Sequence, residues 1–315
     1  SNQLFEENPI LYLNSLEEIE QVLSHVELEK EDSDIEIESP SESQEIDLFS
    51  YLEEDNEKEK DKETKPLISG IEETDVPVQD FVFPDDLEDF YPKTNREKIE
   101  TNIAAIELVK RLEKEGRQAN PEEQELLAKY VGWGGLADAF DETKENWADE
   151  FKELYAVLSP EEYAAARSST LNAHYTSPTV IKAIYEAVGN MGFQAGNILE
   201  PSMGVGNFFG LLPEEMQGSK LYGVELDSIT GRIAKQLYPN ADITVAGFET
   251  TNRRDFFDLA VGNVPFGQYQ VNDRAYNKLG FSIHDYFFAK ALDKVCAGGV
   301  VMFITSKGTM DKASP

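Results

Sequence analysis

Asn263, Val264, Pro265 and Phe266 form the segment of this chain best suited to chemistry. They follow an apolar run, so an amide, a main-chain carbonyl and an aromatic ring would meet at the end of a strand. A conjugated amino group, such as the exocyclic nitrogen of adenine, is a poor nucleophile because its lone pair is delocalised. The Asn263 side-chain oxygen and the Val264 carbonyl can accept both of its N–H bonds while Phe266 stacks on the ring. Such a turn would promote attack through placed acceptors and orientation, without a strong general base.

A glycine-containing loop precedes this turn, at residues 200–208, with the sequence EPSMGVGNF. Gly204 and Gly206 allow the backbone to turn tightly and to approach a ligand closely. The spacing differs from the dinucleotide motif because the next glycine is Gly210, and a plain structural turn is an equal alternative. Glu225 follows about 20 residues later, where a carboxylate can accept hydrogen bonds from ribose hydroxyls. Together, the loop and the acid indicate an adenosine-type cofactor.

These residues lie in a segment where short apolar runs alternate with amphipathic helices. The alternation predicts a doubly wound α/β fold, in which helices cover both faces of a parallel sheet. Ligands bind such sheets at the carboxyl ends of the strands, where all three features would lie. Asp227 is expected to cap the helix that follows it. The expected strands lie near 197–200, 221–225, 243–245, 257–262 and 300–305, and the expected helices near 178–190, 207–212, 228–238 and 285–296.

A helical region, residues 91–170, precedes the sheet. Thr94 can cap a helix that Gly116 ends, and Asn120-Pro121 can begin a second helix. A third helix is expected after Ser159-Pro160. We expect this neck to pack on the main domain as a cap, and the alternative is a surface that contacts nucleic acid or a neighbouring helicase.

Acidic residues dominate the front of the chain. The 315 residues include 28 Lys and Arg against 61 Asp and Glu, a formal net charge of −33, which excludes a generally basic nucleic-acid coat. Residues 1–90 contain 30 of the acids and 5 of the bases, so they carry −25 and the remainder −8. This composition is typical of a disordered tether, although apolar islands such as residues 81–83 allow docking on the folded part or on a partner. We divide the chain into an acidic, largely disordered leader (1–90), the helical neck (91–170) and an α/β domain (171–315).

Several classes of protein and site are not expected. No apolar run reaches the ~18 residues of a membrane helix and no signal peptide opens the chain, which favours a cytoplasmic protein. The single cysteine, Cys296, lies in an apolar run and is expected to be buried, and the three histidines are far apart. Neither a disulfide framework nor a metal site is therefore predicted. His284-Asp285 is better explained by a helix cap at Ser282 than by metal chemistry.

The turn at residues 263–266 resembles the Asn-Pro-Pro-Tyr/Phe signature of S-adenosylmethionine-dependent amino-methyltransferases. Residues 200–208 are similar to their cofactor glycine loop, and Glu225 to their ribose-binding acid. His174 to Pro178 is similar to the segment that holds the methionine end of the cofactor in adenine-N6 DNA methyltransferases. The resemblance implies a Rossmann-like methyltransferase sheet that binds S-adenosylmethionine.

A closer likeness, over about residues 94–312, is to the methylase part of large bacterial helicase–methylase proteins from conjugative elements and phages. It rests on the conjunction of residues 130–136, 171–178 and 282–290. Two features depart from the methyltransferase pattern. Val264 replaces the usual first proline, which keeps the carbonyl but makes the loop less stiff, and Phe248 is not preceded by the usual acidic residue.

The resemblance implies a role for each matching residue. Asn263, Val264, Pro265 and Phe266 would be catalytic. The residues expected to bind the cofactor are Tyr175, Thr176, Glu200, Pro201, Gly204, Gly206, Asn207, Phe208, Glu225, Leu226, Phe248 and Asn263. The loop after the turn suggests substrate contacts by Phe266, Tyr269, Arg274 and Lys278, a mixture suited to a flipped nucleotide and its phosphates. Ordinary loop composition is an equal explanation for the last three.

We therefore expect methyl transfer to adenine N6 in DNA, with the helicase region of the same longer polypeptide as a partner. Alternatives are a protein glutamine amide or an RNA amino group, because each presents a conjugated NH2, and a non-catalytic interaction or anti-restriction module. The resemblance also implies two further strands beyond Pro315, so we expect cofactor binding with weak or no activity in this chain alone. Its negative charge means that DNA affinity must come from other parts or from a local basic patch.

Overall fold

A computed structural model of the chain describes residues 78–306 except residues 88, 171–174 and 268. All of these residues belong to one compact unit. The predictions for residues 1–77 and for His174 lie outside the described residues. Within the described part, no helix is long and apolar enough to cross a bilayer, and no group of three His, Cys, Asp or Glu side chains is arranged to hold a metal ion.

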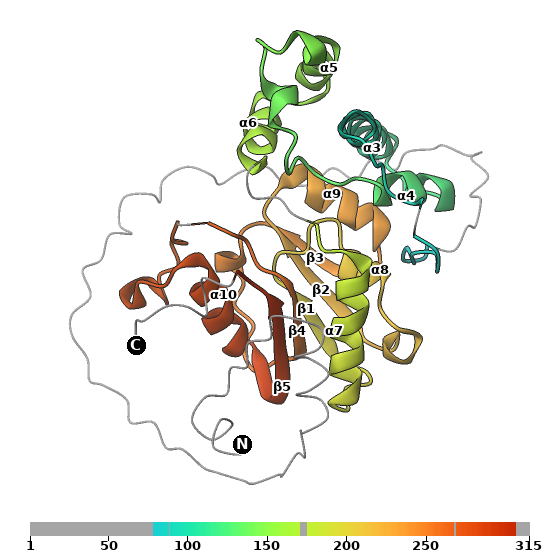
Figure 1. The fold of residues 1–315 in the computed structure, drawn as a ribbon. Helices are drawn as coiled ribbons and strands as arrows, with labels where there is room; N and C mark the ends of the chain where they lie inside the picture. The colour runs from blue at the N-terminus through green and yellow to red at the C-terminus, as the bar shows by residue number, and fades with distance from the viewer. Residues whose placement is uncertain (1–77, 88, 171–174, 268, 307–315) are drawn as a thin grey trace, which may run out of the picture. The chain divides into compact units, whose positions relative to one another are not determined.

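The centre of the described part is a parallel five-stranded sheet with the order β3-β2-β1-β4-β5 (Figure 1). The paired residues bring the carboxyl ends of neighbouring strands to one edge, since Glu225 pairs with Val245 and Asn263 with Ile304. This sheet confirms the predicted doubly wound α/β fold. The strands are β1 (Asn197–Glu200), β2 (Lys220–Glu225), β3 (Asp242–Val245), β4 (Phe257–Asn263) and β5 (Val295–Ile304).

Helices cover both faces of the sheet. Ile198 packs with Tyr185 of α7, whereas the next residue, Leu199, packs with Tyr286 and Phe287 of α10. Because successive side chains of a strand point to opposite faces, α7 and α10 lie on opposite sides of the sheet. The helices of this part are α7 (Pro178–Asn190), α8 (Asn207–Gly210), α9 (Ser228–Leu237) and α10 (Ile283–Leu292), with short 3-10 turns η3 (Glu214–Met216), η4 (Phe248–Thr250) and η5 (Asn277–Leu279).

The start of β5 differs most from the prediction. The strand begins at Val295 rather than near Val300, and α10 ends at Leu292 rather than near residue 296. A bulge lies between its first residue and the regular pairing, with Gly298 in the left-handed region at φ 83°. Bulge residues leave the regular alternation of a strand, so periodicity could not reveal them. Cys296 lies in this bulge and is only half-buried, not buried as expected.

The helical region contains the three predicted helices and one that was not predicted. Thr94 caps the first helix through a capping box and Gly116 ends it in the left-handed conformation. Asn120 and Ser159 cap two others in the same way. The additional helix follows Trp147, which makes no side-chain cap bond, so its sequence lacks the usual start signal. The helices are α3 (Asn95–Glu115), α4 (Pro121–Ala128), α5 (Ala148–Val157) and α6 (Pro160–Ser169), with η1 (Ala137–Phe140) and η2 (Glu145–Trp147).

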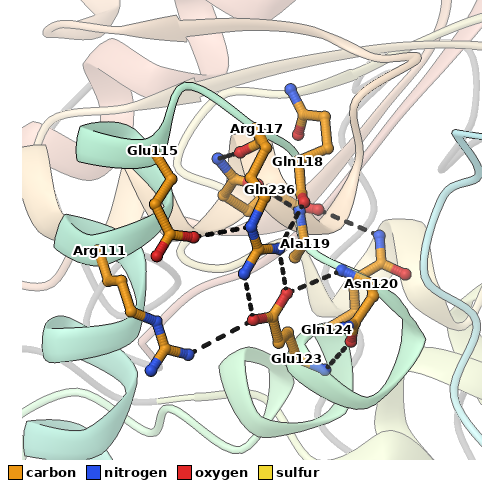
Figure 2. A network of polar contacts seen from close by, with 9 residues as sticks. All are labelled: Arg111, Glu115, Arg117, Gln118, Ala119, Asn120, Glu123, Gln124 and Gln236. Atoms are coloured by element: carbon orange, nitrogen blue, oxygen red, sulfur yellow. Dashed lines mark hydrogen bonds and ion pairs between the residues drawn. The ribbon is translucent and has the colours of Figure 1, made fainter. Parts of the chain in front are cut away.

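A polar network joins the α3–α4 connection to α9 (Figure 2). The Arg117 guanidinium donates to both carboxylate oxygens of Glu123, at 2.6 and 2.7 Å, and to Glu115 at 2.7 Å. Its hydrogen bonds lower the pKa of Glu123 to about 2. The Ala119 N–H donates to the side chain of Gln236 on α9, at 2.8 Å. The helical region is therefore fixed to the helix that packs beside β3.

Residues 78–90, which the charge count grouped with the leader, contribute aromatic residues to the core. Phe81 and Phe83 are buried. The Phe81 N–H donates to the Leu237 carbonyl at 2.8 Å, and the Phe83 N–H to the Gly210 carbonyl at 3.0 Å. This apolar island docks on the folded part, which is one of the two alternatives that the sequence left open.

Candidate active site

A cavity of about 750 Å³ lies at the carboxyl ends of β1, β2, β3 and β4. The glycine loop, Glu225, Phe248 and Asn263 follow or end these four strands in turn, so the fold brings together residues that are far apart in the sequence. The predicted site residues that line the cavity are Tyr175, Thr176, Glu200, Pro201, Gly204, Asn207, Phe208, Glu225, Leu226, Phe248, Asn263, Val264, Pro265, Phe266 and Tyr269.

Three predicted site residues do not line the cavity. Gly206, at φ 89°, packs against the ring of Tyr238. Arg274 and Lys278 are exposed on the connection between β4 and α10. The prediction relied on the composition of that connection, which does not determine the direction of a side chain.

Glu225 is held by main-chain amides. Its two carboxylate oxygens accept hydrogen bonds from the N–H groups of Gly204 and Asp227, each at 2.8 Å. Burial raises the pKa of Glu225 to about 7, although these amide bonds favour the ionised form. Gly204 is in the left-handed region at φ 58°, and Asp227 caps α9 by accepting from the Thr230 N–H at 2.8 Å. Glu225 therefore ties the glycine loop to the start of α9, and its charge changes near neutral pH.

Glu200 and Asn207 place polar atoms deep in the cavity. Glu200 is 2% exposed, and burial, reinforced by the charge of Glu225, raises its pKa well above the usual value. Among the described residues, Oε2 of Glu200 and Oδ1 of Asn207 have no hydrogen-bond partner. Buried polar atoms are normally paired because their desolvation is costly. These two atoms therefore leave hydrogen-bonding capacity for a polar ligand or for water in the cavity.

The predicted turn after β4 faces the same cavity. The Asn263 carbonyl accepts a hydrogen bond from the Ser202 hydroxyl at 2.8 Å, which ties the turn to the glycine loop. The ring of Phe266 packs edge-to-face on His284 of α10, with centroids 5.5 Å apart and an interplanar angle of 68°. Asn263, Phe266 and Glu225 all line the cavity, so the turn after β4 and the Glu225 carboxylate share one space.

Two apolar side chains offer surfaces for a flat ring. Phe248 is buried and stacks on Phe287 of α10, with centroids 5.1 Å apart and an interplanar angle of 28°. Leu226 follows Glu225 and is 74% exposed, although it lines the cavity. Glu225 is half-buried, so this pair offers one apolar and one polar contact to a ligand.

Helix α6 forms a cavity wall that the sequence analysis did not assign. Its position is set by Glu162, which accepts from Lys110 of α3 at 2.5 Å and from Arg232 of α9 at 2.7 Å. These partners are distant in sequence, so no local signal could have revealed the wall. The lining residues from α6 are Glu161, Glu162, Ala165, Ser168 and Ser169, and the loop before η1 adds Tyr130, Gly132 and Trp133.

The lining is strongly acidic. Its acidic residues are Glu161, Glu162, Glu200, Glu225, Asp227 and Glu249, whereas none of the described lysines, arginines or histidines lines the cavity. A cavity lined by one sign of charge concentrates ligands of the opposite sign. The cavity therefore favours a positively charged ligand over a phosphate group, although the raised pKa of Glu200 and the pairing of Glu162 with Lys110 and Arg232 reduce its negative charge.

Known proteins resemble this chain to different extents. No protein-family model matches it. Defense against restriction protein B of Escherichia phage P1 is 29% identical over 216 residues, which are 67% of this chain and 8% of that protein. The type II methyltransferase M.CvrRI of Paramecium bursaria Chlorella virus XZ-6E is 32% identical over 92 residues, which are 29% of this chain and 24% of that protein. The chain thus spans only a small part of either relative.

A solved structure also aligns with this chain. It is a protein of Listeria monocytogenes proposed to be a class I S-adenosylmethionine-dependent methyltransferase, with a TM-score of 0.40 and 13% identity, over 69% of this chain and 76% of that chain. The order of the five strands is that of a doubly wound parallel sheet, and part of the chain is similar in sequence to the viral methyltransferase.

Proposed function

We propose that this chain binds S-adenosylmethionine and forms the methyl-transfer site of an enzyme that modifies adenine N6 in DNA. The observation that carries the proposal is that Glu225, held by the Gly204 amide, lines one cavity with Asn263. Under the proposal, Glu225 would bind the ribose and the turn would bind the acceptor amino group, and both lie at one edge of the sheet.

The residues present fit this cofactor. Glu225 would accept from the ribose hydroxyls, while Leu226 and Phe248 would pack on the adenine. The buried oxygens of Glu200 and Asn207 have no partner among the described residues. They would accept hydrogen bonds from the amino group of the cofactor's methionine part. When bound, S-adenosylmethionine supplies a methyl group on a positively charged sulfur. The acidic lining supports a ligand with that charge.

The acceptor nitrogen would be activated by the turn after β4. The Asn263 side-chain oxygen and the Val264 carbonyl would accept its two N–H bonds, which favours the pyramidal form that can attack a methyl group. Phe266, oriented by His284, would pack on the ring that carries the nitrogen. Positioning and fixed dipoles would thus lower the barrier.

Different observations support the general and the specific parts of the proposal. Similarity to a type II methyltransferase supports methyl transfer in general. The choice of adenine N6 in DNA, and of a helicase region as partner, rests on the resemblance of residues 263–266 and of the segments around them. Flipping of the base would bring the adenine to the cavity while its phosphates stay outside the acidic lining.

The phage relative supports a second candidate function, a non-catalytic anti-restriction module. That protein is called Defense against restriction protein B, and its similarity covers 67% of this chain. The acidic lining also opposes the approach of nucleic-acid phosphates.

Calorimetry with S-adenosylmethionine tests the binding step. We expect the chain and Asn263→Ala to bind with similar affinity, because the Gly204–Glu225 contact does not involve Asn263. Transfer is tested in the longer polypeptide with labelled cofactor on DNA, RNA and protein, and we expect label in DNA adenine that Asn263→Ala abolishes. The proposal is contradicted if titration with S-adenosylmethionine gives no heat and S-adenosylhomocysteine does not compete with it for the protein. Binding without transfer to any acceptor favours the second candidate.

A further inference from the structure

The strap, defined as residues 78–83, is anchored on two helical elements. The Asp80 carboxylate accepts from the N–H of Asn240, just after α9, at 2.9 Å. The Gln79 carbonyl accepts from the side chain of Gln124 on α4, at 3.0 Å. Gln124 also donates to the last turn of α9, and Figure 2 shows it beside the network of the α3–α4 connection. The strap is thus a fixed part of the folded unit.

Phe83 connects the strap with α8, the short helix that follows the glycine loop. Its N–H donates to the Gly210 carbonyl at 3.0 Å. A Cβ atom added to Gly210 would lie 2.7 Å from Cδ2 of Phe83 and 2.6 Å from the hydroxyl oxygen of Tyr238. Only glycine therefore lets Phe83 and Tyr238 approach α8 this closely.

Tyr238 extends this contact to the glycine loop. The residue is 1% exposed, and its ring packs edge-to-face on Phe209, with centroids 5.6 Å apart. A Cβ atom added to Gly206 would lie 2.5 Å from Cε2 of Tyr238. The Gly206 N–H closes the loop on the Met203 carbonyl at 2.8 Å. The ring therefore restricts the conformations that the loop can adopt.

We infer that Phe83 is a positioning residue for the glycine loop. The strap holds Tyr238 against Gly206, and the resulting loop conformation keeps the Gly204 N–H on Glu225. The inference rests on the proposed cofactor binding, and it predicts that strap residues affect affinity although none of them lines the cavity. Coupling between two sites is reciprocal, so the cofactor must in turn stabilise the strap.

A pair of variants in the strap tests this role. Phe81 is the matched control, because it is a buried phenylalanine of the same strap whose N–H bonds to α9 rather than to α8. We expect Phe83→Ala and Phe81→Ala to lower the thermal midpoint of the cofactor-free protein by similar amounts. In calorimetry with S-adenosylmethionine, Phe83→Ala should weaken binding about tenfold and Phe81→Ala less than about threefold. Phe83→Leu, which keeps apolar contact, should fall between wild type and Phe83→Ala.

Hydrogen exchange on the unmodified protein supplies a second readout, with the Phe81 amide as its reference. Saturating cofactor should slow exchange of the Phe83 amide more than that of the Phe81 amide, because stabilisation of the whole fold slows both. Equal affinities of the two alanine variants, or equal slowing of the two amides, overturn the inference while wild-type binding stays intact. If Phe83→Ala does not fold, Phe83→Leu and the exchange rate decide. If the wild-type chain binds no cofactor, the proposed function itself fails, and the inference fails with it.

Discussion

The two walls of the cavity are built in different ways. In the cofactor wall, formed by residues 200–208 and Glu225, a carboxylate accepts hydrogen bonds from the N–H groups of Gly204 and Asp227. In the acceptor wall, formed by residues 263–266, Tyr269 and Val271, the contacts are made by side chains of other elements, such as the Ser202 hydroxyl on the Asn263 carbonyl and His284 on Phe266. Main-chain amides have positions set by the local backbone, whereas side-chain contacts depend on elements distant in sequence. The difference predicts that the cofactor wall determines binding and that the acceptor wall depends on a few tertiary anchors.

The main anchor of the acceptor wall is a buried ion pair. The Lys290 ammonium donates to the Asp273 carboxylate at 2.6 Å and to the Glu249 carbonyl at 3.0 Å. The Tyr286 hydroxyl donates to the same carboxylate at 2.8 Å. Lys290 is 4% exposed, so water cannot replace it. One ammonium therefore connects the loop that carries Asp273 with the segment that carries Phe248.

Replacement of this ammonium should have the largest effect. Lys290→Met leaves the Asp273 carboxylate buried without its cation, which costs about 3 kcal/mol or more and lowers the thermal midpoint by about 6–12 °C. Lys152→Met is the control, because Lys152 forms an exposed pair with Asp149 worth little. The double variant Lys290→Met with Asp273→Asn should recover part of the loss. Equal effects of Lys290→Met and Lys152→Met would show that the acceptor wall has no such anchor.

Removal of the cofactor-wall carboxylate should have the next largest effect. Glu225→Ala deprives two amides of their acceptor, and we expect S-adenosylmethionine affinity to fall about 30- to 150-fold, corresponding to about 2–3 kcal/mol. Phe266→Leu in the acceptor wall should change this affinity less than threefold while it lowers methyl transfer in the longer polypeptide. Calorimetry measures both affinities. A similar loss in the two variants would mean that the walls do not act separately.

The pH dependence of cofactor affinity should also differ between variants of the two walls, with a smaller effect. Glu225 has a pKa of about 7 in the cofactor-free protein because of burial, and a cationic ligand favours its ionised form. The affinity for the cofactor should therefore be highest above pH 7. Below pH 7 it should fall by up to tenfold for each pH unit, until the pKa of Glu225 in the bound protein is reached. Calorimetry between pH 5.5 and 8.5 checks the direction. Glu225→Gln should flatten the profile, whereas Asn263→Ala should retain it, and an affinity that rises on acidification would refute the assignment.

The same difference explains how much could be predicted from the sequence. The glycine loop, Glu225 and the turn at residues 263–266 follow apolar runs that form strands, so the sheet brings them to one edge. Helix starts at Thr94 and Ser159 carry local capping signals. The α6 wall depends on contacts of Glu162 with helices that are distant in sequence. The strap likewise packs on residues that are distant in sequence. Neither feature therefore leaves a local sequence pattern.

The smallest expected effect concerns Tyr238, and it tests whether the ring or the hydroxyl of this residue supports the cofactor wall. Within the described residues, the buried Tyr238 hydroxyl has no hydrogen-bond partner, so Tyr238→Phe should raise the free energy of unfolding by up to about 1 kcal/mol. Cofactor affinity should stay unchanged because the ring against Gly206 remains. Tyr185→Phe is the matched control, since the Tyr185 hydroxyl donates to the Phe208 carbonyl at 2.8 Å, and its loss should cost about 1 kcal/mol. Urea unfolding should thus give opposite signs for the two variants, and the same sign in both would mean that Tyr238 supports the loop through its hydroxyl rather than through its ring.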